Sequence, residues 1–231
     1  MYFSDIFRAC SIFIPEDISI QLNTHYEVQE KNEFFLRMLT QDEGIEFFQY
    51  MYSIDVYRNI FPIWTDDNSN YIGLFYDGPL KYRVCYINHE ETDISPGFRS
   101  VDSFVAELEK NPQLDWDELE KDYPRDKEHN NNEFMDHDLS CIQQLNQLLE
   151  SSELDDELRC QYIFCIMALT PYNQLDTLLK YLDDEDMFVQ ERACETFGFH
   201  RYTPAQEKLK DVMVHGQHNG KLAAKRALSQ I

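Results

Sequence analysis

Between residues 60 and 90 the hydrophobic residues occur in short aromatic and β-branched runs, separated by groups of turn-forming residues. The runs are NIFPIW, YIGLFY and YRVCYIN, and the separators are DDNSN and DGPLK. This pattern is typical of β-strands joined by tight turns. Because Gly78 tolerates a positive φ and Pro79 fixes its own φ, the second and third runs are predicted to form an antiparallel hairpin.

The segments on either side of these strands have helical features. Residues 14–58 show a helical or mixed pattern, with Pro15 placed at a first helical turn. Residues 100–110 contain a helix start at Asp102 or Ser103, followed by apolar residues on one side. The first part of the chain is therefore predicted to be a small antiparallel-rich sheet with flanking helices.

From residue 138 onward the pattern changes, because every segment has a hydrophobic period near 3.6 residues. Short polar or proline-containing links separate these segments, which predicts three antiparallel helical hairpins. The predicted helices cover residues 138–151, 155–169, 173–182, 186–198, 204–215 and 220–230.

An internal repeat with an offset of 31 residues supports a stacked helical array. The aligned pairs are Leu178 with Leu209, Leu182 with Met213, Ala193 with Ala224, and Phe197 with Leu228. Such a period indicates units that each bury one face against a neighbour. The predicted fold class is α+β, with an α+β domain at 1–112, an acidic linker or surface excursion at 113–137, and helical repeats at 138–231.

Charge narrows the range of partners. The chain has 20 basic and 43 acidic residues and a net charge of −23, which repels nucleic acid and anionic membranes and attracts basic partners. No run of about 18 apolar residues is present, and no secretory segment opens the chain, so a cytoplasmic protein is expected. The six cysteines contain no CxxC pair, which predicts buried thiols in a reducing compartment.

The run QLDTLLKYLDDEDMFVQERACETFGF, residues 174–199, resembles a HEAT repeat. Leucines fill the first helix, an acidic turn follows, and small Ala193 in the second helix allows close helix approach. The resemblance covers roughly the last 90 residues. It implies a binding scaffold, without indicating which partner is bound.

The first part of the chain resembles the SUKH superfamily over about residues 12–110. The resemblance rests on Ile14-Pro15, on Phe61-Pro62-Ile63 followed by DDNSNYIGLFY and YRVCYINHEE, and on the closing VDSFVAELEKN. The family has a glycine before the second strand, whereas this chain has Asn70, which also tolerates left-handed backbone. The superfamily includes bacterial immunity proteins, which neutralise toxins that are often nucleases, and yeast regulators of cell-wall synthesis.

The run DDNSN also matches part of a calcium-binding loop, because Asp66, Asn68 and Asn70 fall at loop positions 1, 3 and 5. The position that requires glycine is occupied by Tyr71, and both flanks have strand patterns. Asp and Asn serve a hairpin turn equally well by bonding their own backbone. A β-turn is therefore predicted in place of a calcium site.

Signals for metal binding or catalysis are weak. His215 and His218 lie near His200 in the sequence, and His137 lies apart, but a third ligand at zinc-site spacing is missing. The sequence contains no GxSxG motif, no glycine-rich phosphate loop and no activated Cys/His pair. We therefore expect no metal, no cofactor and no enzymatic activity.

Aromatic residues on the predicted strands, edged by acidic residues, form a candidate partner-binding surface. Core packing and partner binding are both open for the tyrosines, because tyrosine is common in both roles. The candidate residues are Trp64, Asp66, Asp67, Tyr71, Tyr76, Asp77, Tyr82, Glu90, Glu91 and Asp93.

The sequence thus predicts a non-enzymatic protein-binding module. By the SUKH resemblance it is an immunity protein that neutralises a cognate bacterial toxin with a basic, nuclease-type domain. An acidic protein that fills a basic cleft gains fast association as well as affinity. The alternative is a regulatory scaffold for cell-wall or glucan synthesis, which would bind several proteins weakly.

Overall fold

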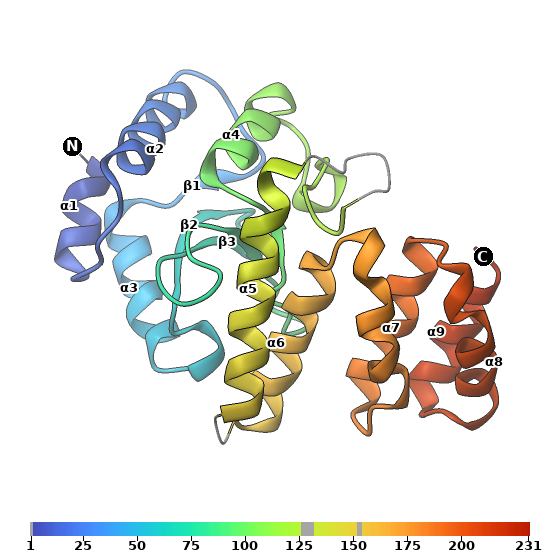
Figure 1. Cartoon of the computed structure of the whole chain (residues 1–231). Coiled ribbons are helices and arrows are strands. Elements are labelled where there is room, and N and C mark those ends of the chain that lie inside the picture. Colours follow the sequence, from blue (N-terminus) through green and yellow to red (C-terminus); the bar gives the residue numbers. More distant parts are fainter. Residues whose placement is uncertain (1, 126–131, 152–153) are drawn as a thin grey trace. The chain divides into compact units, whose positions relative to one another are not determined.

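The computed structural model describes residues 2–125, 132–151 and 154–231, and shows a mixed α+β chain with two compact units, Met1–Asp122 and Tyr123–Ile231 (Figure 1). The N-terminal unit contains a five-stranded antiparallel sheet with flanking helices, and the C-terminal unit is helical. The first unit includes the first ten residues of the predicted linker, where Trp116 and Leu119 are buried in its core.

The sheet has the strand order β1-β2-β3-β4-β5, and every neighbouring pair is antiparallel. The predicted hydrophobic runs are β2, β3 and β4, whereas the short edge strands β1 and β5 have no such run. The elements of this unit are α1 (Tyr2–Ala9), α2 (Glu16–Gln29), β1 (Arg37–Met38), α3 (Gln41–Tyr52), η1 (Asp55–Tyr57), β2 (Ile60–Thr65), β3 (Tyr71–Phe75), β4 (Val84–Ile87), β5 (Pro96–Phe98), α4 (Val101–Lys110) and η2 (Trp116–Glu118).

Both predicted turns join antiparallel strands. Residues 66–70 connect β2 to β3, which confirms the hairpin turn, and Gly78 adopts a φ of +79° between β3 and β4. The left-handed residues of the first turn are Asp67 and Ser69. Asn70, which stands where the SUKH resemblance expects a glycine, does not have a positive φ.

A β-bulge in β2 determines which of its residues face the core. Phe61 pairs with Leu74 and Trp64 pairs with Ile72, with a register shift between Pro62 and Trp64. Directly paired residues point to the same face of a sheet, so the bulge turns Phe61 and Trp64 to one side although they are three positions apart.

Helices cover this core face. The ring of Phe7 on α1 packs edge-on against Phe61 with 5.1 Å between centroids, and Phe104 on α4 packs against Trp64 at 4.7 Å. All four of these residues are almost completely buried. These aromatic contacts hold α1 and α4 against the core face of the sheet.

Capping residues define where two of the helices begin. Thr40 and Glu43 form a reciprocal capping box at the start of α3, and Ser100 with Ser103 does the same for α4. The helix predicted to start at Asp102 or Ser103 thus begins at Val101. Pro15 is the residue before α2.

The six predicted helical segments of the second unit are all present. The segment predicted at 173–182 is a 3-10 helix, and the other five are α-helices. The elements are α5 (Asn132–Ser151), α6 (Asp156–Leu169), η4 (Tyr172–Asp183), α7 (Met187–Phe199), η5 (Thr203–Ala205), α8 (Gln206–His215) and α9 (His218–Leu228).

Neighbouring helices of this unit pack in sequence. Three helical hairpins form, because α5 contacts α6, η4 contacts α7, and α8 contacts α9. The second helix of each hairpin contacts the second helix of the next, so α6 packs on α7 and α7 packs on α9 (Figure 1). The repeat pairs Leu178/Leu209 and Ala193/Ala224 are buried, whereas Leu182 is buried and its partner Met213 is exposed. The offset of 31 residues therefore matches the burial at part of its positions.

Two side chains tie one helical hairpin to the next. Arg159 on α6 donates to Asp184, which lies in the loop before α7. Gln190 on α7 is buried, donates to the Leu182 carbonyl and accepts from the Gln217 backbone N–H before α9 at 2.6 Å. The Arg159–Asp184 contact is an ion pair between side chains, whereas the Gln190 amide satisfies two loop backbone groups that would otherwise lack these partners.

Within the parts of the chain that the structure describes, no helix is both long enough and apolar enough to cross a membrane. Five of the six cysteines are buried and Cys10 is half-buried. Burial raises the pKa of Cys85, and it raises the pKa of Cys194 to about 12, so both side chains are held as neutral thiols.

His25 is held in one tautomer inside the N-terminal unit. The Gln29 side chain accepts from the Met38 N–H and donates to the Leu36 carbonyl, which fixes its amide orientation. Its NH₂ group therefore also donates to His25 Nε2 at 2.9 Å, and His25 Nδ1 donates to Glu109 at 2.7 Å. A second proton on His25 would face a donor, and burial lowers the pKa of this histidine although Glu109 opposes the effect.

We expect the N-terminal unit to lose stability on mild acidification because of His25. Its folded-state pKa lies below the unfolded value near 6.5, so its contribution is present above that pH and is lost as the pH falls toward the folded pKa. Urea unfolding between pH 7.5 and pH 5 measures this loss. Glu109→Gln should steepen it, because the variant removes the group that raises the pKa; an unchanged slope would contradict the assignment.

Gly73 on β3 is required for packing against β2. A Cβ at this position would overlap Cγ2 of the buried Ile60 and lie 3.1 Å from Ile87 Cδ1. We expect Gly73→Ala to lower the free energy of unfolding by about 1–3 kcal/mol through overpacking. In an Ile60→Ala background the same change should cost less, because the overlapping methyl group is gone; equal costs in both backgrounds would rule out this contact as the cause.

Candidate protein-binding site

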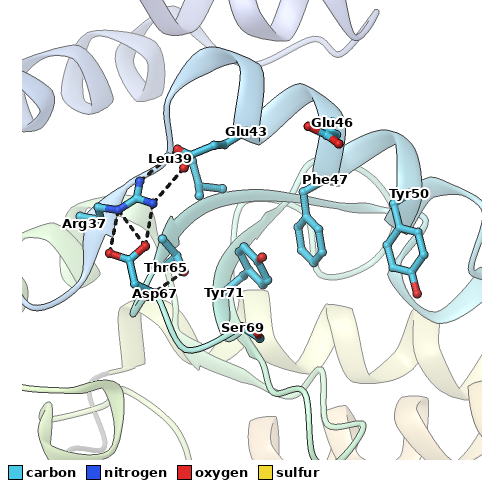
Figure 2. Close-up of a pocket in the computed structure, with 10 residues that line it drawn as sticks. All are labelled: Arg37, Leu39, Glu43, Glu46, Phe47, Tyr50, Thr65, Asp67, Ser69 and Tyr71. Atoms are coloured by element: carbon cyan, nitrogen blue, oxygen red, sulfur yellow. Dashed lines mark hydrogen bonds and ion pairs between the residues drawn. The ribbon is translucent and has the colours of Figure 1, made fainter.

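A hollow of about 520 Å³ opens on the N-terminal unit where β1, β2 and β3 approach α3 (Figure 2). Aromatic rings and carboxylates make up most of its lining. The lining residues are Arg37, Leu39, Glu43, Glu46, Phe47, Tyr50, Thr65, Asp67, Ser69 and Tyr71.

The strand register brings the sheet residues of the hollow together. Arg37 pairs with Thr65 across β1 and β2, and Thr65 pairs with Tyr71 across β2 and β3. These three residues therefore form one row across three strands and point to the same face. The adjacent row, which contains Trp64, points to the core.

Helix α3 supplies the other wall of the hollow through one of its two faces. Gly44, Phe48 and Met51 are the buried residues of α3, at helical spacing. The hollow receives a second stripe from the same helix, also at positions i, i+3, i+4 and i+7. This second stripe consists of Glu43, Glu46, Phe47 and Tyr50.

Three aromatic rings from two elements stand nearly parallel in the hollow. Phe47 stacks on Tyr71 with 3.8 Å between ring centroids and 23° between planes, and it lies 6.1 Å and 26° from Tyr50. Tyr50 is 64% exposed and forms the open end of the row. Burial, with Glu43 adding to it, raises the pKa of the Tyr71 hydroxyl, so the phenol stays neutral.

Arg37 joins the strand β1 to the turn after β2 and to the start of α3. Its Nε and Nη2 donate to Asp67, at 2.6–3.0 Å, and its Nη1 and Nη2 donate to the two carboxylate oxygens of Glu43 at 3.0 and 2.9 Å (Figure 2). The hydrogen bonds to Glu43 and Asp67 raise the pKa of Arg37. In return, the Arg37 guanidinium lowers the pKa of Glu43 to about 2. All three nitrogens of Arg37 are therefore engaged.

The hollow keeps an excess of negative charge. One guanidinium, that of Arg37, faces the three carboxylates of Glu43, Glu46 and Asp67. Glu46 is exposed, and among the residues that the structure describes it has no ion-pair partner. The hollow therefore presents aromatic surface and uncompensated negative charge together.

Asp66 and Asn70 build the turn that carries Asp67. Asp66 is buried, and its carboxylate accepts from the backbone N–H groups of Asn68 and Asn70 at 2.8 and 3.2 Å. The Asn70 side-chain oxygen in turn accepts from the His89 backbone at 3.1 Å. Asp66 therefore has a structural role in the turn, and its carboxylate does not lie on an open surface.

Trp64 is the clearest correction to the predicted surface. Its side chain is 0% exposed and packs on Phe104, because the bulge in β2 turns it to the core. A partner cannot contact it in this structure. Tyr76 is half-buried against Phe48, and its hydroxyl donates to the Arg58 carbonyl at 2.6 Å.

The remaining predicted residues lie at two ends of the sheet. Strand β3 begins at Tyr71 and runs for five residues, roughly 15 Å, before the turn that contains exposed Asp77 and half-buried Tyr82. Glu90 and Glu91 are exposed in the loop after β4, and Asp93 is half-buried and accepts from the Ser95 N–H at 2.9 Å. Of the predicted residues, only Asp67 and Tyr71 line the hollow.

Sequence reasoning missed the residues of the hollow that come from β1 and α3. The available signal was the run TQDEGIEFFQYMY, in which Thr40 and Glu43 match a capping box. After that start, aromatic residues occur on two stripes of the helix. The stripe that contains Phe48 packs in the core, and the stripe that contains Phe47 and Tyr50 does not. An aromatic residue on the second stripe, such as Tyr50, is the part that core packing leaves unexplained.

The described residues contain no group of three or more His, Cys, Asp or Glu side chains that could hold a metal ion. His215 and His218 are exposed on the C-terminal unit and His200 is buried. Comparison of the chain with protein-family models, with curated proteins and with solved structures finds no match. The SUKH and HEAT resemblances thus stay predictions.

We expect Arg37→Gln to lower the free energy of unfolding by about 1 kcal/mol, a modest loss because its ion pairs are more than one-third exposed. The difference should shrink in 1 M NaCl. In the wild type, Glu43 contributes to the free energy of unfolding above its unfolded pKa near 4.5, and this contribution is lost as the pH falls to about 2. Arg37→Gln should lose less stability over the same pH range, because its Glu43 pKa is less depressed.

Arg58→Gln is the matched control, because Arg58 is an exposed arginine of the same unit that pairs with a single carboxylate, that of Asp55. Chemical denaturation of both variants at two salt concentrations measures the difference. Equal losses for the two substitutions would show that Arg37 does not act as a link between three elements.

Proposed function

We propose that this chain is a non-enzymatic protein-binding module whose partner is a basic protein domain. The acidic aromatic hollow on the N-terminal unit is the observation that supports the proposal most directly. Exposed Tyr50 and half-buried Phe47 and Tyr71 supply contact area in a concave site at low entropic cost, and carboxylates select a cationic partner. A net charge of −23 would steer such a partner toward the protein.

The resemblance of the first unit to the SUKH superfamily makes the function more specific. An immunity protein must cover the basic, phosphate-binding cleft of a nuclease-type toxin, and an acidic protein does so with fast association. We therefore propose toxin neutralisation in the cytoplasm as the biological role. The antiparallel sheet with flanking helices is compatible with this resemblance.

The C-terminal unit supports a second candidate function. Its helices α6, α7 and α9 pack in order, and polar ties join successive hairpins, as expected if it is a HEAT-like scaffold. A scaffold of this kind could hold several proteins, as a regulator of cell-wall synthesis would. The number of partners separates this candidate from toxin immunity.

The first test is affinity capture of partners by the tagged full chain from its own cell lysate. Capture at about 0.1 M salt, where screening extends over roughly 10 Å, is compared with capture at high salt. We expect one stoichiometric partner with a basic domain that is retained at both salt concentrations. Several cell-wall enzymes that are lost at high salt would favour the scaffold, and capture of no basic protein would contradict the proposal.

A charge reversal at the hollow then tests the binding surface. We expect Glu46→Lys to weaken binding of the captured partner by at least about tenfold, because it places a like charge against a basic domain. Glu27→Lys on α2 is the matched control, since Glu27 is also exposed and lies outside the hollow. Equal effects of the two variants would show that only the overall charge matters.

A further inference from the structure

The row of aromatic rings in the hollow has one open end. Phe47 stands between the other two rings, and its 3.8 Å separation from Tyr71 leaves no space between that pair. Tyr50 stands at the other end, is 64% exposed, and is on the wall formed by α3 (Figure 2). A flat group that enters the hollow therefore meets the Tyr50 ring first.

The charges of the hollow select a cation for that position. Every nitrogen of Arg37 already donates to Asp67, Glu43 or the Met38 carbonyl, so an anion would have to displace an existing carboxylate. Glu46, by contrast, is exposed and has no ion-pair partner among the described residues. Glu46 and Tyr50 are four positions apart on α3, which places them side by side on the same helical face.

A guanidinium matches this pair of groups better than an ammonium does. It is planar and weakly hydrated, so it stacks on an aromatic ring while its edge donates two parallel hydrogen bonds to a carboxylate. An ammonium is a strongly hydrated point charge and gains less from the flat ring. The hollow thus supplies the ring of Tyr50 for the flat side of a guanidinium and the carboxylate of Glu46 for its N–H groups.

We infer that the hollow receives an arginine side chain of the basic partner, with its guanidinium stacked on Tyr50 and paired with Glu46. This inference rests on the proposed function, because it specifies which chemical group of the partner the module recognises. Arg37 acts as a positioning residue: it holds Asp67 and Glu43 in place on either side of the hollow and does not contact the arginine.

Titration of the full chain with N-acetyl-arginine methylamide, followed by NMR of the aromatic ring protons, tests the inference without the partner. We expect saturable shifts at Tyr50 and Phe47, and binding at least about fivefold weaker for the citrulline analogue, which has the same shape without the charge. The lysine analogue should also bind more weakly. Equal binding of citrulline, or equal or tighter binding of lysine, would overturn the choice of a guanidinium.

Matched variants locate the contact. Glu46→Gln and Tyr50→Ala should each weaken binding of the arginine probe by about fivefold. Glu27→Gln and Tyr52→Ala should not, because Glu27 and Tyr52 are exposed residues of the same types outside the hollow. Shifts that persist in Glu46→Gln and Tyr50→Ala would place the probe elsewhere and overturn the site.

The two proposals can fail separately. If a basic protein is captured from the lysate but the hollow does not bind the arginine probe, the inference falls and the binding function stands. If the probe binds at Tyr50 and Glu46 but the lysate yields no basic partner, the arginine site stands and the proposed function falls.

Discussion

The bulge between Pro62 and Trp64 is the constraint on which the N-terminal unit depends. It adds one residue to β2 relative to β3, so Phe61 and Trp64 both face the helices and Thr65 faces the opposite side. The aromatic core and the floor of the hollow are two consequences of this change in alternation. A regular strand would turn either Phe61 or Trp64 away from the core, at a cost of a few kcal/mol for each large buried ring.

Much of the fold could be predicted from the sequence where local chemistry determines it. The strands β2 to β4 follow from aromatic and β-branched runs. Their turns follow from Asp and Asn side chains that bond nearby backbone N–H groups and from Gly78, which adopts a positive φ. The edge strands β1 and β5 are only two and three residues long, too short to show a period. The 3-10 helix η4 was predicted as a helix, but its tighter winding leaves no separate signal in the hydrophobic pattern.

The candidate site was predictable only in part, because it is made by register. Asp67 and Tyr71 could be proposed from their residue types, and both line the hollow. Arg37 reaches the same place only through pairing with Thr65, and a sequence does not show which residues of distant strands pair. Trp64 was misplaced for a related reason: strict alternation cannot reveal the bulge that turns it inward.

Gln190 has a consequence for how the C-terminal unit unfolds. Its buried amide bonds a carbonyl of its own hairpin and a backbone N–H that belongs to the following one. Gly220 lies so close that a side chain there would overlap the amide, so the α9 backbone closes over it. If α8 and α9 detached, the Gln190 amide would lose its hydrogen bond from the Gln217 N–H and would no longer be packed against the α9 backbone. We therefore expect the last hairpin and the one before it to unfold as one cooperative block, whereas stacked helical hairpins without such a tie could fray from the end one at a time.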